Sequence, residues 1–195
     1  MTLWVWIRNT LLGWSVPVQR LMQLMGKPEP LITDGQFLQI TSQLRDGDVV
    51  LSRENWRFTS LFIPGFYCHA AIFLDGYVYE AVGDAEGGVR RVLAARWVAG
   101  KDHVALLRPS FSLTLSAVSQ FLEAQLGAHY DYEFGAISGQ KVWYCSELVY
   151  AALLVGDPGA PIELRETLGL PTVTPQDFRN MADGGKFILL VEAKN

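Results

Sequence analysis

The stretch Lys141-Val142-Trp143-Tyr144-Cys145-Ser146-Glu147-Leu148-Val149-Tyr150 holds a cysteine where a short apolar segment changes into an amphipathic helix. The helix is predicted because apolar residues recur at helical spacing after the cysteine, at Leu148, Val149, Ala152 and Leu153. Cys145 then lies in the first turn, where backbone amides without intrahelical partners and the positive end of the helix dipole both favour a thiolate. Cys145 is therefore a candidate nucleophile.

The composition predicts one folded domain. The chain has 195 residues, of which 50% are hydrophobic and 18% are charged, enough to bury a sizeable core. A net charge of -4, without a basic stripe, argues against nucleic acid as a partner. The 2 cysteines cannot form a disulfide framework, and the 3 histidines lack metal-ligand spacing. We therefore predict no metal and no other cofactor, and a free thiol in a reducing compartment or a protected site.

The first 30 residues differ from the rest of the chain. Met1–Gly26 has an apolar helical stripe, three tryptophans and no acidic residue, and Lys27-Pro28-Glu29-Pro30 reads as a linker. Polar and charged residues interrupt the run too often for a bilayer span, and its order does not match a secretory signal. We expect 1–30 to be an arm that packs on the domain or a partner, or that makes peripheral membrane contact. The expected location is cytoplasmic, with 31–195 as a single catalytic domain.

A hairpin is the clearest supersecondary signal. Two apolar runs, Tyr67–Leu74 and Tyr77–Val82, flank Asp75-Gly76, a dipeptide typical of a two-residue type I′ turn. Pairing through this turn makes His69 and Glu80 diagonal neighbours on one face of the sheet, within reach of long side chains.

This pairing predicts a catalytic set. Glu80 can orient the His69 imidazole and stabilise its charged form, which is the role of the third member of a cysteine–histidine triad. Cys68 points to the opposite, core-like face, so Cys145 is the sensible nucleophile. Each residue also has a plain structural interpretation, as a buried small hydrophobe, a core histidine or an edge-strand charge. The three together favour catalysis, because the chemistry requires all of them.

Other polar and aromatic residues have weaker signals. Tyr130 and Tyr132 lie in an aromatic, acidic segment that either lines a substrate cleft or covers the core. Tyr144, beside the candidate nucleophile, either donates to an oxyanion or only packs. His103 and His129 lack such context, and we interpret both as structural or exposed.

The remaining pattern predicts an α+β protein, because strands cluster in the middle of the chain and two helices follow. Additional strands are expected at 48–52, 88–92, 103–108 and 186–191. Helices are expected from Thr33 or Asp34 through Leu44, as a turn at 94–98, over 113–126 and from Thr174-Pro175 onward.

Several motifs follow one another in a characteristic order: Gly47-Asp48-Val49-Val50, His69-Ala70-Ala71-Ile72-Phe73, Val78-Tyr79-Glu80-Ala81, Gly88-Val89, Tyr130-Asp131-Tyr132-Glu133-Phe134 and Tyr144-Cys145-Ser146-Glu147-Leu148-Val149. This set resembles the circularly permuted NlpC-type papain-like proteins, in particular the bacterial YiiX/YaeF-like group. Lecithin–retinol acyltransferase-like enzymes are more distant relatives. Histidine before cysteine is the order of the permuted group, and the resemblance covers about Leu44 to Phe178.

The resemblance implies a permuted papain-like fold, with an antiparallel sheet or barrel packed against the cysteine helix. By position it implies Cys145 as nucleophile, His69 as general base and acid, and Glu80 as the orienting residue. We predict a cysteine amidase or peptidase that cleaves peptides or amino-acid amides, including cell-wall-type peptides, through a thioester. One alternative is a membrane-associated, lipid-directed acyltransferase or esterase. Another is a non-catalytic module that binds a peptide, an amino acid or a lipid.

Overall fold

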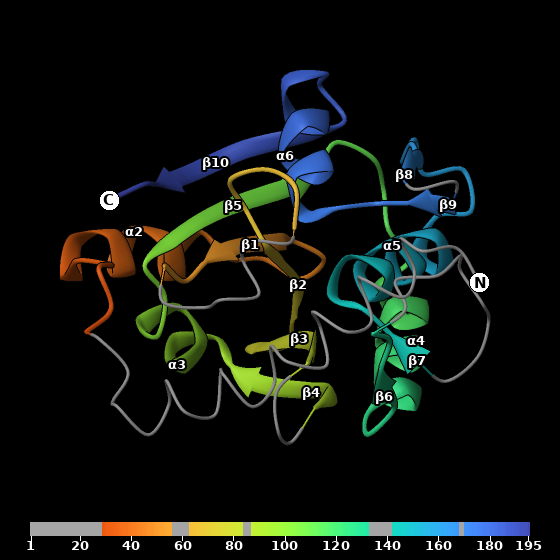
Figure 1. Ribbon diagram of the computed structural model, residues 1–195, viewed down its shortest axis with the longest axis horizontal. Helices are drawn as coiled ribbons and strands as arrows, with labels where there is room; N and C mark the ends of the chain where they lie inside the picture. Colours follow the sequence, from red (N-terminus) through yellow and green to blue (C-terminus); the bar gives the residue numbers. More distant parts are fainter. Residues whose placement is uncertain (1–28, 56–62, 84–86, 133–141, 168–169) are drawn as a thin grey trace, which may run out of the picture.

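The computed structural model describes residues 29–55, 63–83, 87–132, 142–167 and 170–195 (Figure 1). The predicted arm at 1–30 lies almost entirely outside these residues, as does much of the loop before Phe66. Within the described ranges, no helix is long and apolar enough to cross a membrane.

A six-stranded antiparallel sheet forms the centre of the molecule, in the order β10-β5-β1-β2-β3-β4 (Figure 1). Its strands are β1 Val49–Arg53, β2 His69–Leu74, β3 Tyr77–Val82, β4 Gly88–Leu93, β5 His103–Pro109 and β10 Phe187–Ala193. Two small two-stranded sheets accompany it, β6 His129–Tyr130 with β7 Val142–Trp143, and β8 Arg165–Thr167 with β9 Leu170–Thr172. The sequence did not predict these short pairs, because two or three residues carry no readable periodicity.

Helices cover both faces of the large sheet. The helices are α2 Asp34–Gln43, α3 Ala94–Ala99, α4 Leu115–Gln125, α5 Cys145–Gly156 and α6 Pro175–Asp183. Side chains of α4, α5 and α6 pack with one set of sheet residues, which includes Leu51 and Ile72. Side chains of α2 and α3 pack with the alternate set, which includes Val50 and Ala71. The period of two along each strand thus divides the core into two layers.

Capping residues correctly predicted where α2 and α6 begin. Thr33, rather than Asp34, caps α2 in a capping box with Gln36, and Thr174 caps α6 in the same way. α4 begins at Leu115, two residues later than predicted. Its N-cap is Thr114, whose amide donates to the carbonyl of Gly156.

The hairpin register is as predicted from its turn. Asp75 and Gly76 have φ values of 49° and 78°, the two positive values of a type I′ turn. The strand pairs are Ile72↔Tyr79, Phe73↔Val78 and Leu74↔Tyr77.

Gly88, the first residue of β4, lies against backbone. Its φ is +132°, and a Cβ there would be 2.3 Å from the carbonyl oxygen of Ala128. We expect Gly88→Ala to lower the free energy of unfolding by about 2–3 kcal/mol, because both the backbone angle and the contact are unfavourable. Urea denaturation measures this loss. Gly76→Ala is the control, since its φ is +78° with nothing within 4 Å. An equal loss in both variants would contradict the role of the contact.

Candidate active site

Helix α5 places Cys145 at its first helical position. Tyr144 is the N-cap with extended backbone angles, and β7 leads into it, as the change from apolar segment to helix predicted. The Cys145 side chain is buried, and α5 packs against β2 and β3. The sulfur therefore lies beside the hairpin, with the amides of the first helical turn close to it.

Strands β2 and β3 part at the end of the hairpin nearest Cys145. The ladder between them runs from Leu74↔Tyr77 to Ile72↔Tyr79, and His69 lies beyond it while still pairing with Ser52 of β1. Phe73 donates its amide to the carbonyl of Asp48, the residue just before β1, so Ala70, three residues away, directs its amide toward β3. That amide bonds to the Cys145 sulfur instead of a strand partner. The parting of the strands thus makes room for the cysteine.

His69 lies between Glu80 and Cys145. Its Nε2 is 2.8 Å from Glu80 Oε2, and its side chain also hydrogen-bonds with Cys145. Since Nε2 faces the carboxylate, Nδ1 is the ring nitrogen that remains for the sulfur. The predicted diagonal contact between His69 and Glu80 therefore forms, although the two residues lie beyond the end of the backbone ladder.

The environment of the pair favours a thiolate and an imidazolium. Burial acts to lower the pKa of His69, but the hydrogen bonds to Cys145 and Glu80 outweigh it and raise that pKa above 6.5. Burial acts to raise the pKa of Cys145, but His69 and the amide of Ala70, with a smaller contribution from Ser146, lower it below 9.0. A thiol with a lowered pKa beside a histidine is the arrangement of an activated cysteine nucleophile.

Glu80 is buried and fully bonded on both oxygens. Arg90 Nε donates to Oε1 at 2.9 Å, while Trp97 Nε1 donates to Oε2 at 2.7 Å. Burial acts to raise the pKa of Glu80, but His69, then Lys101 and Arg90, hold it well below 4.5. The carboxylate is therefore ionised where it faces the imidazole.

The structure places Tyr130 and Tyr132 beside the segment that carries Cys145. Tyr130 pairs with Trp143 in the parallel β6–β7 ladder, and the amide of Asp131 donates to the Trp143 carbonyl at 3.0 Å. The two tyrosine rings meet edge to face at 5.0 Å, and Tyr132 is 41% exposed. Both rings lie against Gly83, where a Cβ would be 3.0 Å from Tyr130 and 3.2 Å from Tyr132.

Tyr144 is buried, and its hydroxyl accepts a long hydrogen bond, 3.4 Å, from the amide of Val173. The oxygen of this hydroxyl is therefore directed at Val173. Burial raises the pKa of this tyrosine well above 10.0, so its hydroxyl stays protonated.

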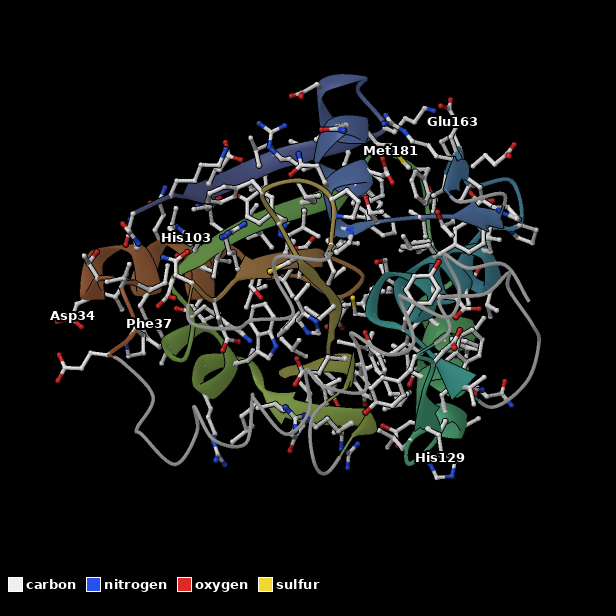
Figure 2. All side chains as sticks on the ribbon, in the orientation of Figure 1. Asp34, Phe37, His103, His129, Glu163 and Met181 are labelled. Carbon is white, nitrogen blue, oxygen red and sulfur yellow. The ribbon has the colours of Figure 1, made fainter. Side chains whose placement is uncertain are left out.

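The other cysteine and histidines lie apart from this arrangement. Cys68 is buried with its sulfur 3.8 Å from the carbonyl of Ser52. His103 is buried and bonds to Asn55 and to the amide of Asn195, whereas His129 is exposed (Figure 2). Figure 2 shows the two histidines far from each other, His103 near α2 and His129 beside α4. Among the described residues, no three His, Cys, Asp or Glu side chains gather as a metal site.

Three residues around Glu80 were not predicted from the sequence: Arg90, Trp97 and Lys101. Arg90 faces Glu80 in the β3–β4 ladder, and that pair would have been predictable if the register of β4 had been known. The sequence indicated only that Trp97 is an apolar residue in a short helical turn. No local pattern in the sequence indicates its hydrogen bond across the sheet face.

A cysteine at a helix start, bonded to a histidine that contacts a carboxylate, is the arrangement found in papain-like thiol hydrolases. Residues 43–183 match the model of the family described as permuted papain-like amidase enzyme, YaeF/YiiX, C92 family. The chain belongs to this family and has its permuted papain-like fold.

A solved structure supports the same fold. The chain resembles the crystal structure of the metalloprotein yiiX from Escherichia coli O157:H7, with a TM-score of 0.61 and 20% sequence identity. The similarity covers 78% of this chain and 99% of that one. No curated protein matches the chain.

Proposed function

We propose that this protein is a cysteine amidase or peptidase in which Cys145 is the nucleophile, His69 the general base and acid, and Glu80 the residue that orients His69. The observation that supports this most directly is the position of His69, bonded to Glu80 through Nε2 and to Cys145 through its side chain. Membership of an amidase family agrees with this chemistry.

The first half of the proposed reaction forms a thioester. The Cys145 thiolate attacks the carbonyl carbon of an amide, and the carbonyl oxygen becomes an oxyanion. The Cys145 backbone amide, at the N-terminus of α5, stabilises that charge. Collapse of the tetrahedral species breaks the C–N bond, and the His69 imidazolium gives its proton to the leaving amine.

The second half releases the acid and regenerates the enzyme. Neutral His69 takes a proton from water, which attacks the thioester carbonyl. Collapse of the second tetrahedral species breaks the C–S bond, releasing the carboxylic acid and the Cys145 thiolate. His69, now an imidazolium, again pairs with that thiolate and with Glu80.

The proposed substrates are small peptides or amino-acid amides, and Tyr130 and Tyr132 are proposed to line the cleft. Tyr132 is partly exposed, and the β6–β7 pairing holds both residues next to the nucleophile-bearing segment. Such aromatic rings offer a wide apolar surface with a polar tip, which suits the side chain and backbone of a peptide.

Labelling with a thiol-directed activity probe tests the proposal. We expect the wild-type chain to be labelled at Cys145, Cys145→Ala to lose the label and Cys68→Ala to retain it. The Cys145 sulfur bonds to His69, which favours a thiolate, whereas the Cys68 sulfur faces the carbonyl of Ser52, an acceptor that favours the neutral thiol. Mass spectrometry of the labelled peptide identifies the site. Equal labelling of wild type and Cys145→Ala would show that Cys145 is not the reactive thiol.

The two shifted pKa values also predict the pH dependence. The thiolate–imidazolium pair of Cys145 and His69 exists once the pH exceeds the lowered pKa of Cys145, and it is lost when the pH exceeds the raised pKa of His69. A plot of kcat/KM against pH is therefore expected to be bell-shaped. Iodoacetamide should still alkylate Cys145 at about pH 6, where an ordinary thiol is less than about 1% thiolate. If Cys145 instead titrated as one ordinary thiol and did not react at about pH 6, that result would contradict the thiolate–imidazolium pair.

A further inference from the structure

The carboxylate of Glu80 is supported from the sheet face that α3 covers (Figure 1). Trp97 of α3 donates its indole N–H to Oε2, the oxygen that also faces His69. Arg90 of β4 holds Oε1. With each oxygen bonded to fixed donors, the carboxylate keeps one orientation, and the position of the imidazole follows from it.

A buried ion pair lies directly behind the indole. Lys101, four residues after Trp97, has its Nζ 4.5 Å from the centre of the Trp97 ring and 2.6 Å from Glu54 Oε1. Both charged side chains are at most 8% exposed. Removing two charges from water costs about as much as their attraction returns, so such a pair is weak evidence for stability. Its place against Trp97 points to a different role.

That role is electrostatic. With a thiolate at Cys145 and an imidazolium at His69, negative and positive side chains alternate. The series continues inward through Glu80, Lys101 and Glu54. Arg90, which is partly exposed, is a second cation beside Glu80. Lys101 contributes to the low pKa of Glu80 even though no hydrogen bond joins the two side chains. Without the cations and donors around it, a carboxylate this buried would tend to take up a proton and lose its hold on the imidazolium.

We propose that Trp97 and the Lys101–Glu54 ion pair are positioning residues for the candidate active site, which keep Glu80 ionised and directed at His69. The inference rests on the proposed role of Cys145 as nucleophile. None of the three residues is proposed to touch the substrate or the sulfur, and each acts through Glu80.

Trp97→Phe is the first test, because it removes the N–H donor and keeps a ring beneath Lys101. Loss of a donor near the carboxylate raises the pKa of every neighbouring acid, so the pH at which Cys145 becomes a thiolate moves upward. We expect the rate of Cys145 alkylation by iodoacetamide at about pH 6 to fall about tenfold, with the rate at high pH unchanged. Mass spectrometry of the Cys145 peptide separates this signal from Cys68.

Tyr79→Phe is the matched control. It also removes a hydrogen bond between an aromatic side chain and a carboxylate, Glu123, from the residue next to Glu80 in β3. Tyr79 lies in the core layer on the opposite face of the sheet. We expect its alkylation curve to coincide with that of the wild type.

The double variant Lys101→Met, Glu54→Gln removes the ion pair without leaving a buried charge alone, and it is expected to shift the curve in the same direction. A lower unfolding temperature with an unmoved curve in both variants would overturn the inference and leave the proposed function standing. A wild-type Cys145 that titrates like an ordinary thiol would overturn the proposed function, and this inference with it.

Discussion

Replacing His69 by alanine is expected to lower kcat/KM for a peptidyl p-nitroanilide substrate by at least about 10³-fold. The imidazole supplies both the proton acceptor for the nucleophile and the acid for the leaving amine. Its loss also removes the main cause of the lowered pKa of Cys145, and because burial of the thiol remains, that pKa should rise. Steady-state kinetics and the pH dependence of Cys145 alkylation measure the two effects separately.

His129→Ala is the control for His69→Ala, because His129 is exposed at the start of β6 and belongs to no part of the candidate site. It is expected to leave both measurements unchanged. If His69→Ala kept its rate within tenfold of wild type, His69 would not be the base.

Replacing Glu80 by glutamine is expected to lower kcat/KM by about 10³-fold and the free energy of unfolding by about 3 kcal/mol. Both carboxylate oxygens accept from donors, Oε1 from Arg90 and Oε2 from Trp97 and His69. Whichever way the amide turns, its NH2 group therefore meets another donor. If the NH2 faces His69, it favours the ring tautomer with its proton on Nδ1, which cannot accept a proton from Cys145.

The stability effect of Glu80→Gln depends on pH in a defined direction. The pKa of Glu80 is lowered in the folded protein, so ionised Glu80 stabilises the fold fully above its unfolded pKa, near 4.5. The stability difference between wild type and variant should shrink as the pH falls from there through the folded pKa. Urea denaturation at a series of pH values measures it.

Glu123→Gln provides the comparison for Glu80→Gln. Glu123 also bonds a tyrosine and an arginine, but its side chain is 43% exposed. Exposed pairs contribute about 0–1 kcal/mol, so this variant should be nearly as stable as wild type and equally active. Similar losses in the two variants would show that Glu80 has only an ordinary structural role.

Much of the fold was predictable because its signals are local. The Asp75-Gly76 turn fixed the hairpin register, and the apolar spacing after Cys145 gave the helix start. Capping residues gave the starts of α2 and α6. Each signal lies within about ten residues of the structure it predicts, so chain sterics and backbone hydrogen bonding settle it without the rest of the molecule.

The sequence by itself determined the candidate residues Cys145, His69 and Glu80 and the α+β class, because residue type, strand alternation and helical period are properties of short segments. Only the tertiary structure decided how these residues meet. β2 and β3 part so that the amide of Ala70 and the ring of His69 reach the sulfur. Contacts across the sheet face bring Trp97 and Lys101 to Glu80. Such contacts depend on how separate elements pack, and burial then makes each charge depend on its neighbours.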